Sequence, residues 1–238
     1  MRHLAIGLLL GIPLIASAAG RPPKPVDLTM SWIVSIDKTG AIRSIRPTED
    51  KNFGLYQRLE AGIRKYWKFT PGKVDGKPEV SETTLTVHST LEPVDGYYRV
   101  RVRDAATGPR YDTTVPPKYP DDAVMSRRGG AVLLDVKYDA NGHVTDAKAI
   151  AGGDPKPGHD VERAAVLAVK QWTFKPETIG GHGLAGKARV PLCFAPVPAM
   201  ENHCRWVSPD TQKPLDADRP VALGSIVHID TDVTTQDL

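Results

Sequence analysis

Cysteine is scarce in this 238-residue sequence, and aromatic side chains make up only 6% of it. The two cysteines, Cys193 and Cys204, are too few for a disulfide-dense scaffold, and they form no Cys-x-x-Cys redox motif. In an oxidising compartment they suit a single disulfide that pins the segment after the last predicted strand. Two separate thiols are the alternative.

The sequence also has no large excess of positive or negative side chains. The formal net charge is +3 and basic residues alternate with acidic ones, so the sequence lacks the clustered basic face of a nucleic-acid binder. The seven histidines show no ligand spacing, and no Gly-x-Ser-x-Gly elbow occurs. Residues 181–186 fit Gly-x-Gly-x-x-Gly, but they follow a helix rather than a strand. We therefore expect no enzyme, no cofactor, no metal site and no nucleic-acid partner.

A long apolar run occurs only at the start of the chain. Basic residues 2–3 precede the apolar residues 4–15, and the small residues 16–18 follow them. This order is typical of a secretory signal peptide. The run is shorter than the roughly 20 apolar residues that span a bilayer, and it contains Pro13. We expect residues 1–19 to be cleaved, which leaves a periplasmic protein without a membrane span.

The most informative feature that is present is a repeat. The motif Trp-x-Phe-x-Pro occurs twice, each time after apolar residues at helical spacing. Each helix pattern follows two alternating runs joined by a hairpin, with Gly40 in the first copy and Gly142 in the second. Another alternating run follows each motif. The motif residues, which we expect to be structural with the rings in the core, are Trp67, Phe69, Pro71, Trp172, Phe174 and Pro176.

Each unit therefore has the order strand, hairpin, strand, helix, strand. One helix on a three-stranded antiparallel sheet is a two-layer α+β arrangement, and we predict two such ββαβ domains in tandem. The domains cover residues 26–95 and 113–198, joined by a strand and linker at 96–112. Asp160 is the expected N-cap of the second helix. A turn-rich tail at 199–238 follows, in which only residues 221–229 suit a strand.

The second unit resembles the C-terminal domain of TonB, the periplasmic partner of outer-membrane receptors. The resemblance rests on Tyr119-Pro120 before the first strand, Gly142 in the hairpin, the Ala-rich helix and Trp-x-Phe-x-Pro. It implies that Tyr119 and Pro120 fix the chain entry and that Gly142 supplies a turn with positive φ. The first unit lacks Tyr-Pro and is similar to a degenerate copy.

The resemblance implies a function carried by the backbone, in which an extended receptor peptide adds as a strand beside the last strand. Pro191 suits a sheet edge but removes one donor, so either residues 83–91 form the freer edge or the units cover each other's edges. The candidate edge residues are Arg189, Val190, Leu192 and Phe194 in the second unit and Thr83, Leu85, Val87 and Ser89 in the first.

These features predict a periplasmic module that binds an outer-membrane receptor or another envelope protein and is linked to TonB-dependent transport. The alternative is a self-associating assembly protein of the envelope, such as a homodimer. A full energy transducer would need an uncleaved membrane helix and a long spacer. Residues 21–25 are the only Pro-rich spacer near the leader, and they reach about 15 Å. The sequence therefore argues against direct transduction.

Overall fold

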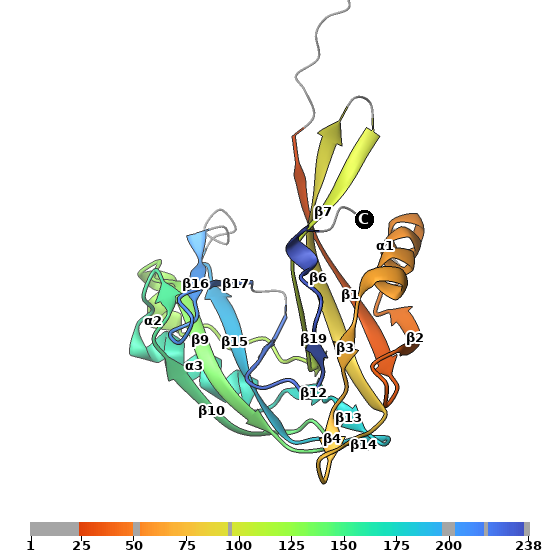
Figure 1. The fold of residues 1–238 in the computed structure, drawn as a ribbon. Coiled ribbons are helices and arrows are strands. Elements are labelled where there is room, and N and C mark those ends of the chain that lie inside the picture. The colour runs from red at the N-terminus through yellow and green to blue at the C-terminus, as the bar shows by residue number, and fades with distance from the viewer. Residues whose placement is uncertain (1–23, 50–52, 95–96, 197–202, 217–218, 236–238) are drawn as a thin grey trace, which may run out of the picture.

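The protein is described by a computed structural model that covers residues 24–49, 53–94, 97–196, 203–216 and 219–235. The predicted leader, residues 1–19, lies outside these ranges. Within them, no helix combines the length and apolar character needed to span a bilayer. Figure 1 shows two lobes, one around β1, β6 and α1 and the other around β9, β10, β15 and α3.

The first lobe is built on a long central strand, β6 (Ser81–Val94). β1 (Val26–Ile36) pairs with it, and β2 (Ile42–Pro47) lies outside β1. Apolar residues alternate along β1, so one face of this sheet is apolar, and helix α1 (Phe53–Tyr66) contributes to the same core. That core includes Trp32, Val34, Ile36, Leu59, Ile63 and Trp67.

The second lobe repeats the order β2-β1-β6. β9 (Gly130–Tyr138) takes the place of β1, with β10 (Val144–Ile150) on one side and β15 (Gly186–Phe194) on the other. Helix α3 (His159–Val169) follows β10 in the chain, and its apolar face joins the same core. The buried residues here include Leu134, Val136, Val161, Ala165, Val169, Trp172 and Phe174.

The remaining elements connect and extend the two lobes. Between β2 and β15 they are β3 (Phe69–Thr70), β4 (Lys73–Val74), β5 (Lys77–Pro78), β7 (Tyr97–Gly108), β8 (Arg110–Thr113), α2 (Asp121–Met125), β11 (Gly153–Asp154), β12 (Thr173–Lys175), β13 (Thr178–Ile179) and β14 (His182–Gly183). In the tail they are β16 (Arg205–Val207), β17 (Pro214–Leu215), β18 (Val221–Ala222), β19 (His228–Ile229) and the 3₁₀ turn η2 (Val233–Thr235).

The two sheets share a strand order but are larger than predicted. The orders β2-β1-β6 and β10-β9-β15 match, each with its helix before the third strand. The prediction of three strands in each sheet is wrong, because β7, β13 and β14 extend the first sheet to six strands and β18 extends the second to four. Since β13 and β14 come from the second half of the chain, they bind the two lobes together.

The repeated motif acts as the predicted structural anchor in both lobes. Trp67, Phe69, Trp172 and Phe174 are all buried. The indole of Trp172 donates a 2.7 Å hydrogen bond to the carbonyl of Val115, in the segment that leads into the second lobe. The hairpin glycines have positive φ, as expected, at 86° for Gly40 and 90° for Gly142.

The start of the second lobe is fixed by Tyr119. Its hydroxyl donates a 2.8 Å hydrogen bond to the carbonyl of Arg128, and its ring packs edge-on against Phe194. Pro120 follows as the residue before α2. The predicted cap at Asp160 is wrong, since Gly158 is the N-cap of α3 and makes no side-chain cap. Asp160 instead pairs with Arg128 at 3.0 Å, and this hydrogen bond lowers the pKa of the Asp160 carboxyl.

The tail is folded across both lobes rather than being a loose, turn-rich end. Cys193 and Cys204 form the predicted disulfide. Beyond it, β16 pairs with β11, β18 pairs with β15, and β19 pairs with β3 in the first lobe. The predicted strand-forming stretch, residues 221–229, contributes both β18 and β19.

Candidate functional site

The first candidate edge, on β6, is an interior strand. One border pairs with β1 from Ser81 to Leu91, and the other pairs with β13 and then with β7 from Thr84 onward. The main-chain groups that an added strand would need are therefore already used. The prediction of a free edge at Thr83, Leu85, Val87 and Ser89 is wrong, because the strand expected in the linker folds back onto β6 as β7.

The second candidate edge, on β15, is partly covered. One border pairs with β9 along the whole strand, and the other meets β18 at Ala188 and Arg189. The amide of Leu223 adds a 2.9 Å hydrogen bond to the carbonyl of Lys187. In the part of the chain that the structure describes, no strand pairs with this outer border beyond Arg189.

The alternation of peptide groups along β15 limits what this border offers. Lys187 and Arg189 turn their peptide groups outward to β18, so those of Val190, Leu192 and Phe194 face β9. The next outward position is Pro191, which has a carbonyl but no N–H. Of the four predicted residues on this strand, only Arg189 presents its main chain to the outer border.

The side chain of Arg189 anchors the tail. It is buried, and its guanidinium donates to Asp135 on β9 at 3.0 Å and to the Ser208 hydroxyl at 2.8 Å. Asp210 lies 2.6 Å from its second terminal nitrogen. Burial disfavours the charge, but the bonds to Asp210 and Asp135 outweigh it and raise the pKa of Arg189. Arg189 is thus committed to holding residues 208–210 against the sheet.

A second anchor holds the residues that follow β18. The buried carboxylate of Glu177 accepts 2.6 Å hydrogen bonds from the hydroxyls of Thr83 and Ser225, and a 3.1 Å hydrogen bond from the amide of Ile226. Thr83 belongs to the first sheet and Ser225 to the tail, so Glu177 joins three parts of the chain. Nothing in the local pattern around Glu177 indicates this role, because it depends on contacts between residues far apart in the sequence.

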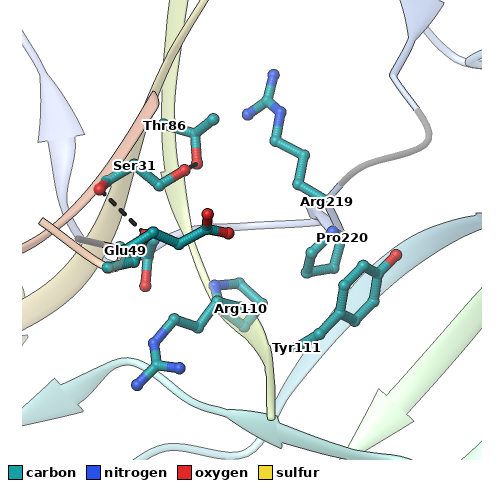
Figure 2. A pocket seen from close by; sticks show the side chains of 10 residues that line it. Ser31, Glu49, Thr86, Arg110, Tyr111, Arg219 and Pro220 are labelled. Atoms are coloured by element: carbon teal, nitrogen blue, oxygen red, sulfur yellow. Dashed lines mark hydrogen bonds between the residues drawn. The ribbon is translucent and has the colours of Figure 1, made fainter. Parts of the chain in front are cut away.

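A polar cavity of about 270 Å³ is lined by residues of the first sheet, of β8 and of the tail. Figure 2 shows Ser31 and Thr86 on one side, Arg110 and Tyr111 on another, and Arg219 and Pro220 from the tail above them. The Ser31 and Thr86 hydroxyls lie 2.9 Å apart and bond to each other, and no histidine lines the cavity. Its lining offers charges of both signs, from the carboxylate of Glu49 and the guanidinium groups of Arg110 and Arg219. Because Arg219 and Pro220 directly precede β18, a movement of β18 would change this cavity.

Comparison with known proteins identifies relatives of the second lobe. Residues 115–196 match the family model described as Gram-negative bacterial TonB protein C-terminal. Protein TonB from two strains of Xanthomonas campestris pv. campestris is 40% identical over 80 residues, which are 34% of this chain and 34% of each relative. The chain thus spans about a third of the length of these relatives. The solution NMR structure of the Pseudomonas aeruginosa TonB CTD aligns at 23% identity and a TM-score of 0.30, over 36% of this chain and 84% of that one.

Proposed function

Because residues 115–196 belong to the TonB C-terminal domain family, we propose that this protein is a periplasmic protein-binding module that serves TonB-dependent transport. It binds an extended segment of an outer-membrane receptor or of another envelope protein. The segment pairs as a strand with the outer border of β15, in the position that β18 occupies in the free protein.

The observation that carries this proposal is that β18 pairs with only a short part of the outer border of β15. β18 pairs with only Ala188 and Arg189, and Leu223 adds one bond to Lys187. Each such hydrogen bond contributes a net of about 0.5–1.5 kcal/mol, so β18 is held mainly by its anchors on either side. An incoming strand would use the same peptide groups and extend to the carbonyl of Pro191.

The exchange of one strand for another is nearly balanced in main-chain hydrogen bonds. Affinity must then come from the side chains of the incoming segment, which favours selective over general binding of extended peptides. A segment that fails to replace the packing of Ala222 against Gly108 would bind poorly, since Gly108 leaves room there for the Ala222 methyl group.

Site-specific photo-crosslinking in the protein's own cells tests this proposal. A photoreactive residue replaces Lys187, whose side chain is exposed on β15, and in a control it replaces the exposed Lys170 after α3. We expect position 187 to capture an outer-membrane receptor, with the crosslink mapping to an extended segment of it, and position 170 not to. Equal capture at both positions, or no envelope protein at position 187, would overturn the proposal.

A further inference from the structure

We propose that the junction of the two lobes binds a small carboxylic acid that carries several hydroxyl groups, with Arg110 as the residue that takes the carboxylate. The site lies on the face of the first sheet away from α1, and no residue of β15 lines it. The proposal therefore goes beyond the proposed function, and the two can be tested separately.

A second pocket adjoins the polar cavity at this junction. It has a volume of about 160 Å³ and shares Arg110 and Thr84 with the cavity of about 270 Å³. Ile33 on β1 lies opposite Thr84 on β6, and both alternate with the residues that face α1. Lys175 and Thr178 line the pocket from the second half of the chain. A ligand here would contact both lobes.

Arg110 is the least compensated charge in this pocket. Arg46 lies 3.9 Å from Glu82, and Lys175 lies 3.2 Å from Asp112. Within the described residues Arg110 forms no salt bridge, and its interaction with Asp112 is a longer-range one. Three basic side chains thus meet two carboxylates, which leaves one positive charge for a ligand to neutralise.

A carboxylate matches this pocket in charge and in geometry. It carries one negative charge, and its two oxygens suit the planar fork of a guanidinium. A phosphate monoester carries nearly two charges and would leave one uncompensated beside Glu82. Thr84 and Thr178 can donate to the same oxygens, because their hydroxyls form no hydrogen bond within the described part of the chain. Figure 2 shows the Arg110 guanidinium turned away from Arg219, so it is not held at the far side of the cavity.

The adjoining cavity offers partners for hydroxyl groups. Glu49, which follows β2, supplies a carboxylate that accepts hydrogen bonds, and Arg219 in the tail supplies a guanidinium that donates them (Figure 2). A hydroxyl both donates and accepts, so a polyhydroxyl chain suits this mixture better than a second charged group does. Tyr111 and Pro220 add apolar surface against which its C–H groups can pack.

The size of the site limits the ligand to a small molecule. The two pockets measure about 160 and 270 Å³, and sites for small ligands usually enclose roughly 300–1,000 Å³. The pair therefore accommodates a single free sugar acid, with the carboxylate at Arg110 and the hydroxyl-bearing chain toward Glu49.

Isothermal titration calorimetry of the full chain without its leader tests this site, with gluconate as the probe. We expect one gluconate to bind per chain. Acetate lacks the hydroxyl groups and glucose lacks the carboxylate, so each should bind about tenfold more weakly or not at all. Arg110→Gln should weaken gluconate binding by about tenfold or more, because it removes the charged partner. Arg163→Gln on α3 is the matched control, since Arg163 is exposed and lines neither pocket.

Thr84→Val is a second variant that removes one hydroxyl with little change in volume, and it should weaken gluconate binding about threefold or more. Circular dichroism of each variant establishes that it is folded. Absence of gluconate binding at millimolar concentration, or binding that Arg110→Gln and Thr84→Val leave unchanged, would overturn the proposal. Glucose or acetate binding as tightly as gluconate would equally overturn it. Crosslinking at position 187 bears on the proposed function alone, because Lys187 lines neither pocket.

Discussion

Gly142 lies so close to the backbone of Phe174 that a Cβ atom at Gly142 would overlap the carbonyl oxygen of Phe174. The amide of Phe174 donates a 2.8 Å hydrogen bond to the carbonyl of Gly142. Gly40 has the same close approach to the carbonyl of Phe69 in the first lobe. The hairpin glycine and Trp-x-Phe-x-Pro are thus two halves of one packing unit that the chain uses twice.

This relationship predicts that Gly142→Ala is strongly destabilising. The positive φ alone costs about 1–3 kcal/mol for a residue with a Cβ atom, and the overlap with Phe174 adds to that. Gly76→Ala is the matched control, because Gly76 also has positive φ but has open space around it. Urea denaturation of both variants should show the larger loss for Gly142→Ala. Equal losses would mean that the contact with Phe174 is unimportant.

Glu177→Ala should loosen the tail. The substitution leaves the Thr83 and Ser225 hydroxyls and the Ile226 amide without their shared acceptor, and we expect a loss of about 2–4 kcal/mol in the free energy of unfolding. Limited proteolysis of the tail should also become faster. Glu82→Ala serves as control, since its side chain is 43% exposed and lies 3.9 Å from Arg46. A Glu177→Ala variant as stable and as resistant to protease as Glu82→Ala would contradict this role.

Removing the disulfide should destabilise the second lobe. Cys193 and Cys204 are 11 residues apart, and closing so short a loop contributes about 2–4 kcal/mol, mainly by restricting the unfolded chain. The bridge also holds Trp206 near Leu133 in a small separate cluster. Thermal unfolding with and without reductant checks this. The double variant Cys193→Ser, Cys204→Ser should match reduced wild type and be insensitive to reductant.

Tyr138 should make stability fall at alkaline pH. Burial raises the pKa of Tyr138 to about 12, and the Glu177 carboxylate adds to the rise. The tyrosine pKa is about 10 in an unfolded chain, so the folded state holds the proton more tightly. The resulting stability is complete below pH of about 10 and is lost as pH rises toward about 12. Tyr138→Phe keeps the ring stacked on Phe174 and should lose less stability over that interval in urea titrations. Parallel pH profiles would contradict this origin.

The sequence predicted those features that depend on neighbouring residues. Helical spacing before Trp67 and Trp172 located α1 and α3, and the hairpin glycines located two strand pairs. It did not predict which borders are occupied. Periodicity indicates the face on which a side chain lies, but border pairing uses peptide groups that nearly every residue carries. The local pattern therefore could not predict that β7 folds back onto β6 or that Val221 pairs with Arg189.

Hydrogen–deuterium exchange of the tail tests the proposed binding at β15 most directly. The probe is a synthetic peptide of the receptor segment that the crosslink at position 187 identifies. At saturation we predict faster exchange in residues 219–226, because β18 is displaced, and continued slow exchange in residues 186–194, because the new strand replaces it. Unchanged exchange in residues 219–226 with the peptide bound would show that binding occurs elsewhere and would contradict strand replacement.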